Sequence, residues 1–143
     1  TRFSRFFNAT CIDYDASAPI AYPTMSCNVT GNELPFAPEL KVHFGASREI
    51  ALGHSGTLVL SGNLSYNSGY FAEPDNVVRQ GAYATVDASA EWRPVRGGPS
   101  VRLWVLNLTN ARYFNILVAF PTASVSQSPA APTRHGASLS FAY

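Results

Sequence analysis

Five long stretches of this sequence alternate between apolar and polar residues, and this alternation restricts the fold more than any other feature. Along Ala82 to Arg93, small apolar residues such as Ala84 and Val86 occupy every second position, and polar residues such as Thr85 and Asp87 lie between them. Side chains of a β-strand point alternately to opposite faces, so this pattern indicates a strand with one apolar and one polar face. The five predicted strands are Leu40 to Ile50, Thr57 to Asn67, Ala82 to Arg93, Ser100 to Thr109 and Thr133 to Tyr143.

The length of these strands and the spacing between them point to a membrane. Each strand runs for about ten to twelve residues, whereas globular strands average about five or six and a tilted strand crossing a bilayer needs about nine to eleven. The connections alternate between long and short, as they do in outer-membrane barrels. They are Thr10–Pro38, Gly53–Gly56, Ser68–Gly81, Pro94–Pro99 and Asn110–Pro132. The sequence therefore predicts an all-β fold, an antiparallel meander of long strands forming part of a transmembrane β-barrel.

The composition agrees with that prediction. Charged residues make up 13% of the chain and the formal net charge is +1, against about 25% charged residues in typical soluble domains. This balance gives no reason to expect nucleic acid as a partner. No run of 18 apolar residues occurs, so a membrane role has to use strands. The chain begins at Thr1 without a secretion signal, so either a signal was removed or the chain starts within a longer protein.

Aromatic residues gather at the predicted strand ends, where barrels carry aromatic girdles. Trp92 and Tyr143 lie at the short-turn ends, and a larger set lies beside the long connections. That set is Tyr66, Tyr70, Phe71, Tyr83, Tyr113 and Phe114. Arg48 falls on the apolar side of its strand near a short turn, where a charge costs about 0–1 kcal/mol. It would reach the headgroups by snorkelling, or a bulge would turn it to the other face.

Cys11 and Cys27 enclose a segment rich in Pro, Ala, Ser and Tyr. One interpretation is a disulfide across a long exposed loop, which implies an oxidising compartment. The alternative is two unrelated thiols.

Several motifs resemble those of TonB-dependent outer-membrane receptors. Leu34-Pro35-x-Ala37-Pro38, within Gly31 to Pro38, is similar to the segment that opens a late barrel strand in that family. Ser68-Gly69-Tyr70-Phe71, then Asn76 and Ala82-Tyr83, resembles the loop and strand that follow. Val101-Arg102-Leu103-Trp104-Val105-x-Asn107-Leu108-Thr109-Asn110-x-x-Tyr113 is similar to the family's most recognisable late motif. The resemblance extends over Gly31 to Tyr143.

The end of the chain resembles the C-terminal signal that the barrel-assembly machinery reads. This similarity involves Arg134 and, as the signal proper, Gly136, Leu139, Phe141 and Tyr143. The usual last residue is Phe, and here it is Tyr143. If the last strand ends in the periplasm, the long connections face outward.

The resemblance implies that the whole protein takes up a scarce nutrient, such as a ferric siderophore, with energy relayed by TonB. Family members carry a plug domain, a TonB-contacting segment and about twenty-two strands. This chain would be the C-terminal part of such a barrel, with five full strands and part of a sixth in Thr1 to Asn8. Its partners would be outer-membrane lipid, the barrel-assembly machinery and a small-molecule ligand, with TonB contacted by upstream parts.

Enzymatic and metal sites find little support in the sequence, and no cofactor is expected. Gly53-His54-Ser55-Gly56 resembles a serine-hydrolase elbow, but Thr57 stands where that motif needs Gly. His43, His54 and His135 lie on different segments without ligand spacing. Asp87 and Glu91 share a strand face; they are interpreted as polar lumen residues that pair with Arg93 or Arg102 rather than as a catalytic carboxylate pair.

The outward connections are the remaining place for a functional site. The candidates for ligand contact are Tyr70, Phe71, Tyr113, Phe114 and Phe120, although girdle or loop packing would also explain them. Two other folds are alternatives to a section of a large barrel. A soluble secreted β-sandwich that binds carbohydrate or protein explains the strands and a disulfide, but not the strand length or loop alternation. A complete small barrel needs at least eight strands, more than the sequence offers.

Overall fold

The computed structural model describes residues 1–12, 24–120 and 124–141. The chain divides into two compact units, each of which is described by itself. Unit 1 comprises Thr1–Lys41, Asn67–Tyr83 and Arg112–Ala130, and so contains the first two long connections and most of the third. Unit 2 comprises Val42–Tyr66, Ala84–Ala111 and Ala131–Tyr143. Tyr143, Ala142 and the side chain of Phe120 lie outside the described part of the chain.

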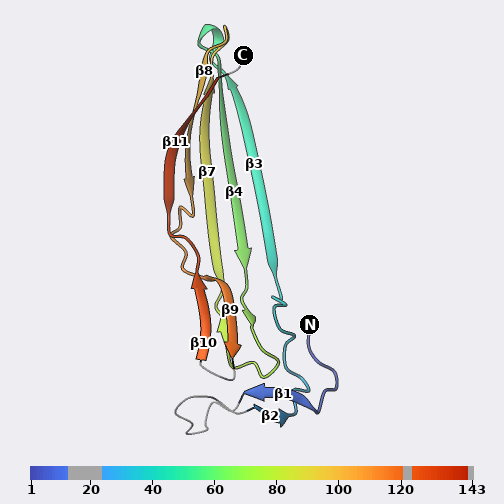
Figure 1. The fold of residues 1–143 in the computed structure, drawn as a ribbon. Coiled ribbons are helices and arrows are strands. Elements are labelled where there is room, and N and C mark those ends of the chain that lie inside the picture. Colours follow the sequence, from blue (N-terminus) through green and yellow to red (C-terminus); the bar gives the residue numbers. More distant parts are fainter. Residues whose placement is uncertain (13–23, 121–123, 142–143) are drawn as a thin grey trace. The chain divides into compact units, whose positions relative to one another are not determined.

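The largest sheet has five long strands (Figure 1). Their order across the sheet is β11-β8-β7-β4-β3, which apart from the short hairpins is also their order along the chain. A short 3-10 helix, Gly53–Ser55, joins β3 to β4. The all-β meander is thus confirmed. The strands are β3 (Lys41–Ala51), β4 (Thr57–Asn67), β7 (Tyr83–Arg93), β8 (Pro99–Leu106) and β11 (Arg134–Phe141).

The register of the central strands separates the two faces of the sheet. Residues opposite each other in an antiparallel ladder point to the same face. Leu103 lies opposite both Ala90 and Ala137, and Val101 lies opposite Trp92 and Leu139, so these residues form one apolar face. The other face is polar and includes the aligned residues Glu91, Arg102 and Ser138.

Trp104 interrupts the alternation of its strand, and the register shows where it points. It lies opposite Ser89 on one side and Gly136 on the other, so its indole is on the polar face. A Cβ added to Gly136 would lie only 2.6 Å from Trp104 Cζ2. The indole therefore occupies the space that a side chain at position 136 would need.

Neither face of this sheet is covered by a second layer. No described apolar side chain of the five strands is buried, and large apolar residues stay open. Phe44 is 64% exposed, Leu103 58% and Leu139 64%. A β-sandwich buries one face of each sheet against the other, so this exposure counts against the sandwich alternative.

Unit 1 contains three short antiparallel hairpins and the buried core of the described chain. The disulfide between Cys11 and Cys27 joins the first two strands, with a Cα–Cα distance of 6.0 Å. Ala9, Cys11 and Val29 form a core cluster, against which Phe3 and Cys27 pack. The hairpins are β1 (Ala9–Ile12) with β2 (Thr24–Cys27), β5 (Tyr70–Phe71) with β6 (Arg79–Gln80), and β9 (Phe114–Phe120) with β10 (Ser124–Pro129).

The structure corrects three sequence expectations. The three long connections were expected to be loops, but each holds a hairpin, β1–β2 in the first, β5–β6 in the second and β9–β10 in the third. Thr1 to Asn8 forms a single bridge, Arg2 to Glu33, where part of a strand was expected. β8 ends at Leu106 rather than Thr109, because Asn107 and Asn110 adopt left-handed backbone conformations (φ 51° and 48°) that a strand cannot contain.

Candidate functional site

A cavity of about 400 Å³ lies within unit 1. Three residues expected from the sequence to contact a ligand, Tyr70, Tyr113 and Phe114, line it. Phe71 does not; its ring lies 5.5 Å from the guanidinium carbon of Arg79. The complete lining is Phe36, Pro38, Lys41, Asn67, Tyr70, Tyr83, Tyr113, Phe114 and Asn115. We call this cavity the aromatic pocket.

Two pairs of rings shape the aromatic pocket. Tyr83 and Tyr113 stack almost parallel, with ring centroids 4.0 Å apart and 2° between their planes. Phe36 and Tyr70 make a tilted contact at 5.5 Å and 45°. Tilted pairs with centroids about 4.5–7 Å apart are a favoured arrangement of aromatic rings. The lining of the pocket therefore combines phenylalanine rings with tyrosine phenols.

Phe36 is held in an unusual backbone conformation. Its φ is 55°, in the left-handed region that non-glycine residues seldom occupy. Its amide N–H donates a hydrogen bond to the carbonyl oxygen of Phe71 at 2.8 Å, which fixes the segment. The Phe36 side chain is 56% exposed, so its ring is available to a ligand.

Two buried amide side chains, Gln80 and Asn67, hold backbone groups around the aromatic pocket by hydrogen bonds. Gln80 is 4% exposed, and its Oε1 accepts a hydrogen bond from the backbone N–H of Phe114 at 2.9 Å. Asn67 is 6% exposed, and its Oδ1 accepts one from the N–H of Gly69 at 2.9 Å. Buried polar groups with satisfied hydrogen bonds rigidify their surroundings. The backbone that carries Phe114 is thus positioned before any ligand arrives.

The chemistry of the aromatic pocket follows from its lining. Lys41 is the one charged residue among the residues that line it, and the remaining polar groups are phenols and amides. A cationic ammonium group attracts anions, while ring faces pack against flat, apolar groups. The arrangement suits a small anionic molecule that carries flat or aromatic parts.

The sequence pattern did not indicate that Phe36, Lys41 or Asn67 line a pocket, and it predicted a place in an aromatic girdle for Tyr83. Tyr83 falls on the polar side of the alternation, together with Thr85 and Asp87. A position on the polar side of the strand argues against a place for Tyr83 in a lipid-facing girdle. Phe36 and Lys41 carry no comparable sequence signal, because their role depends on which segments meet in space.

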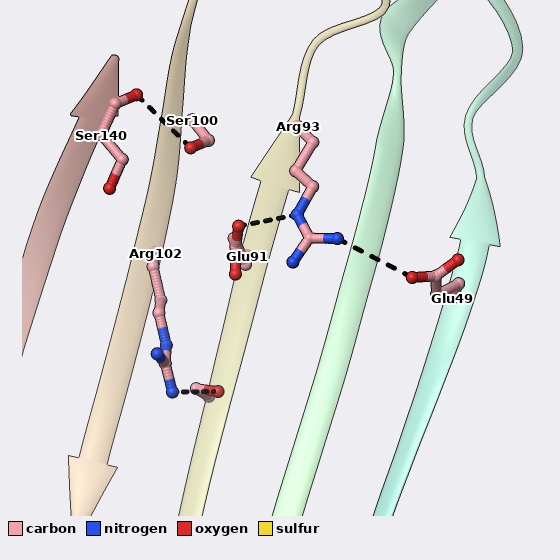
Figure 2. A network of polar contacts seen from close by, with 7 residues as sticks. Glu49, Glu91, Arg93, Ser100, Arg102 and Ser140 are labelled. Carbon is pink, nitrogen blue, oxygen red and sulfur yellow. Dashed lines mark hydrogen bonds and ion pairs between the residues drawn. The ribbon is translucent and has the colours of Figure 1, made fainter. Parts of the chain in front are cut away.

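The polar face of unit 2 carries a network of charged and hydroxyl side chains near the short turns (Figure 2). Arg93 contacts Glu91 at 2.7 Å and Glu49 at 3.8 Å. Arg102 donates to Ser89 Oγ at 3.2 Å, and Ser100 donates to the carbonyl oxygen of Ser140 at 3.4 Å. Because Glu49 points to this face, the neighbouring Arg48 belongs to the apolar face.

Asp87 and Glu91, the two carboxylates on one face of β7, bind different partners. Glu91 is bound to Arg93, whereas Asp87 accepts a hydrogen bond from the backbone N–H of Asn107 at 2.8 Å. Both carboxylates therefore act as structural acceptors.

The residues of the serine-hydrolase-like motif lie in a short turn, and His43 lies on a strand of the sheet. His54 and Ser55 belong to the short 3-10 helix, and His43 Nδ1 lies 2.9 Å from Ser65 Oγ. Within residues 1–12, 24–120 and 124–141, no group of three or more His, Cys, Asp or Glu could hold a metal ion. In the same ranges no helix is long and apolar enough to cross a membrane.

The residues of the suggested assembly signal lie on β11. Gly136 faces Trp104, as described above. Leu139 and Phe141 are 64% and 62% exposed and follow the parity of the apolar face. Tyr143 lies beyond the described residues.

Known proteins share this fold. The family model "TonB dependent receptor-like, beta-barrel" matches residues 3–108. The solved ferric yersiniabactin uptake receptor FyuA from Yersinia pestis is 21% identical, with a TM-score of 0.67 over 85% of this chain and 21% of that chain. BauA, the ferric preacinetobactin receptor from Acinetobacter baumannii, is 22% identical, with a TM-score of 0.61 over 79% of this chain and 16% of that chain.

No curated protein matches the sequence. The chain spans about a fifth of the length of the solved FyuA receptor. The family model covers well over half of the chain, and the two structural similarities agree in fold. The chain therefore belongs to the TonB-dependent receptor-like β-barrel family.

Proposed function

We propose that this chain forms a C-terminal section of the barrel wall of an outer-membrane receptor that takes up a scarce nutrient, such as a ferric siderophore. Its family consists of outer-membrane transport receptors rather than enzymes. The five long strands would contribute to the wall, and unit 1 would supply connections on the outer surface. Energy would reach the receptor through TonB, contacted by parts of the protein outside this chain.

One observation carries the proposal: the five-stranded sheet is uncovered on both faces, and one of these faces is apolar. Along the central strands, Ala90, Leu103 and Ala137 align across one face, while Glu91, Arg102 and Ser138 align across the other. Exposed apolar surface of this extent is unfavourable in water. In a barrel wall the apolar face meets lipid and the polar face meets the lumen.

The aromatic pocket supports the proposal that the protein binds a small-molecule ligand. A ferric siderophore carries flat chelating groups and often a net negative charge, which would suit the rings of Phe36 and Tyr113 and the ammonium of Lys41. The two solved receptors are described as ferric yersiniabactin and ferric preacinetobactin receptors. For this chain, Tyr70, Tyr113 and Phe114 remain proposed contacts, joined by Phe36, Lys41 and Tyr83.

The last strand would also engage the barrel-assembly machinery. Leu139 and Phe141 are open on the apolar side of β11, where an assembly factor could read them before the barrel closes. β3 and β11 lie at the two edges of the described sheet, so each is paired on its inner side and has no strand partner on its outer side. Pairing with the rest of a barrel would satisfy both edges.

Iron-limited growth tests the proposed uptake directly. A strain lacking the gene would be supplied with three probes: a ferric tris-catecholate, a ferric hydroxamate and a ferric carboxylate chelate. We expect the intact protein to restore uptake of radioactive iron from at least one chelate, and only when TonB is present. Failure of all three chelates under iron limitation would contradict siderophore uptake.

Pocket variants of the intact protein then test the site. Lys41→Ala and Tyr113→Ala should weaken binding of the accepted chelate about tenfold, because each removes a contact worth about 1.4 kcal/mol. Arg96→Ala serves as the control, since Arg96 is an exposed cation in a short turn and does not line the pocket. Equal binding by all three variants would remove the aromatic pocket from the proposal.

A further inference from the structure

Arg48 is the one charged residue on the apolar side of β3. Its neighbour Glu49 points to the other face, where it pairs with Arg93 at 3.8 Å (Figure 2). The ion pairs found in the described part of the chain involve Arg2 and Arg93, and none of them includes Arg48. A guanidinium offers five N–H donors. The Arg48 side chain is therefore available to an anion from outside the chain.

The pairing of β3 with β4 places Arg48 beside Leu60. Two contacts hold residues of these strands opposite each other, and both fall within this stretch of the sheet. The pairs are His43 with Ser65 (Nδ1 to Oγ, 2.9 Å) and Leu52 with Gly56 (N to O, 2.8 Å). The same number of residues separates the two pairs along each strand, so this described stretch contains no bulge. Arg48 therefore lies opposite Leu60, and both side chains point to the apolar face.

The apolar face is hollowed around Leu60. One hollow, of about 270 Å³, is lined by Ala46, Ser47, Arg48, Leu60, Ser61 and Gly62. A second, of about 460 Å³, shares Leu60 and Ser61 with the first. Most of its other lining residues lie on the apolar face, and these are Ala88, Ala90, Leu103 and Val105. We call the two hollows together the sheet groove.

Arg48 lies near the end of the sheet that carries the short turns. It precedes Ala51, the last residue of β3, by about 10 Å along the strand, at about 3.3 Å per residue. At the same end, the Trp92 indole N–H donates to the carbonyl oxygen of Ser55 at 2.8 Å, and tryptophan is enriched where a membrane meets water. Strand tilt shortens the distance along the membrane normal, so a long arginine side chain reaches the headgroups.

We propose that Arg48 and the sheet groove form a binding site for an anionic phospholipid in the leaflet beside the short turns. The guanidinium would hold the lipid phosphate, and an acyl chain would lie in the groove past Leu60. This inference rests on the proposed place of the sheet in a barrel wall.

Charge and shape both favour a lipid over a free anion. A guanidinium fork matches the geometry of a phosphate and binds it through two parallel hydrogen bonds. Among the described residues that line the sheet groove, Arg48 alone carries a charge. The rest of the groove is therefore suited to hydrocarbon, which a free phosphate does not have. A phospholipid satisfies the cation and fills the groove at once.

Native mass spectrometry of the intact protein in detergent measures the binding of individual lipids without any ferric chelate. The protein would be titrated with phosphatidylglycerol or with phosphatidylcholine of identical acyl chains. We expect phosphatidylglycerol to bind its first site about fivefold more tightly, because one cation near an anionic lipid contributes about that much. Glycerol phosphate, which has no acyl chains, should not compete when added in excess.

Two variants separate the headgroup contact from the acyl-chain contact. Arg48→Gln removes the charge, so both lipids should bind equally well. Ala46→Leu keeps the charge and fills part of the groove, so it should weaken both lipids about threefold by removing carbon–carbon contacts of the acyl chain. Ala46→Leu adds an apolar group to an open apolar face and should therefore assemble normally, which a heat-modifiability gel checks.

Arg96→Gln is the matched control. Arg96 is an exposed cation in a short turn at the same end of the sheet, and it does not line the sheet groove. This variant should keep the preference for phosphatidylglycerol. An unchanged preference in Arg48→Gln, an equal loss in Arg96→Gln, or competition by glycerol phosphate would overturn the proposal.

A spin label at position 44 distinguishes failure of the lipid site from failure of the barrel-wall assignment. Phe44 lies on the apolar face of β3 and does not line the sheet groove. In lipid vesicles the label should meet lipid-soluble oxygen. Access to oxygen without a lipid preference would overturn the lipid site alone, whereas no access to oxygen would overturn the barrel wall and the lipid site together.

Discussion

At the scale of single residues, Trp104 and Gly136 show how one close contact fixes the pairing of two strands. The indole lies over Gly136 on the polar face, and the register places the two residues directly opposite each other. An aromatic ring that covers a strand glycine shields the exposed backbone and pins the register. Gly136 therefore has a structural reason to be glycine that is independent of any recognition by assembly factors.

Substitution at Gly136 separates these two roles. Gly136→Ala would place its Cβ 2.6 Å from Trp104 Cζ2, and such overpacking costs about 1–3 kcal/mol. We expect a lower urea midpoint for the folded protein in detergent. The double substitution Gly136→Ala with Trp104→Leu should recover most of this loss. If it does not recover, the glycine is needed for something other than the space of the indole.

The sequence predicted which face of the sheet most residues occupy, but it did not predict the contact between Trp104 and Gly136. Ala84, Val86 and Asp87 follow the alternation closely, so their faces could be read directly. Around Trp104 the run Leu103-Trp104-Val105-Leu106 is uniformly apolar, and alternation carries no information there. Gly136, the partner that accommodates the ring, lies far along the chain. Only the paired register identifies it.

At the scale of elements, the long strands were predictable because apolar and polar residues alternate along each of them over many positions. β4 was expected at Thr57–Asn67 and is found there, and β7 starts one residue later than expected, at Tyr83. The β9–β10 hairpin was missed for a physical reason. Phe114–Phe120 is apolar apart from Asn115, and its partner Ser124–Pro129 is mostly polar, with Val125 and Pro129 as the exceptions. Neither strand alternates, so neither resembles a strand by itself.

The two faces of β4 provide an element-scale prediction. Leu60 lies on the apolar side and Ser61, its neighbour, on the polar side. Leu60→Arg should destabilise the inserted protein by about 1 kcal/mol, the upper end of the range near the membrane interface, because Leu60 lies as close to the short turn as Arg48 does.

Ser61→Arg is the matched comparison and should change stability by about 0.5 kcal/mol or less, as surface substitutions usually do. Urea unfolding in lipid vesicles measures both. Equal costs for the two variants would mean that the faces of β4 are not divided between lipid and water.

At the scale of the whole molecule, the five-stranded sheet has two edge strands, each of which is paired on one side only within the described chain. β3 and β11 lie at its two edges, and unpaired strand edges readily join other strands. The sequence could predict this incompleteness from the number of strands. It could not predict the aromatic pocket, because Phe36, Tyr70 and Tyr113 come from three distant segments that only the folded chain brings together.

Isolation of this chain provides a whole-molecule prediction. Five strands are fewer than the eight of the smallest closed barrels, so liposomes that contain only this chain should show no chelate-specific uptake. The isolated chain should also associate through its edges, which chemical cross-linking would detect. Chelate-specific uptake by these liposomes would show that the rest of a barrel is not required.

The two faces of β7 decide most directly whether the sheet forms part of a membrane-spanning barrel wall. Single spin labels placed at each position from Ala84 to Glu91 of the intact protein in lipid vesicles would report access to lipid-soluble oxygen and to a water-soluble nickel chelate. We predict that labels at 84, 86, 88 and 90 favour oxygen, while labels at 85, 87, 89 and 91 favour the nickel chelate, since successive side chains point to opposite faces. The reverse pattern, or no alternation, would contradict the assignment of this sheet to a membrane-spanning barrel wall.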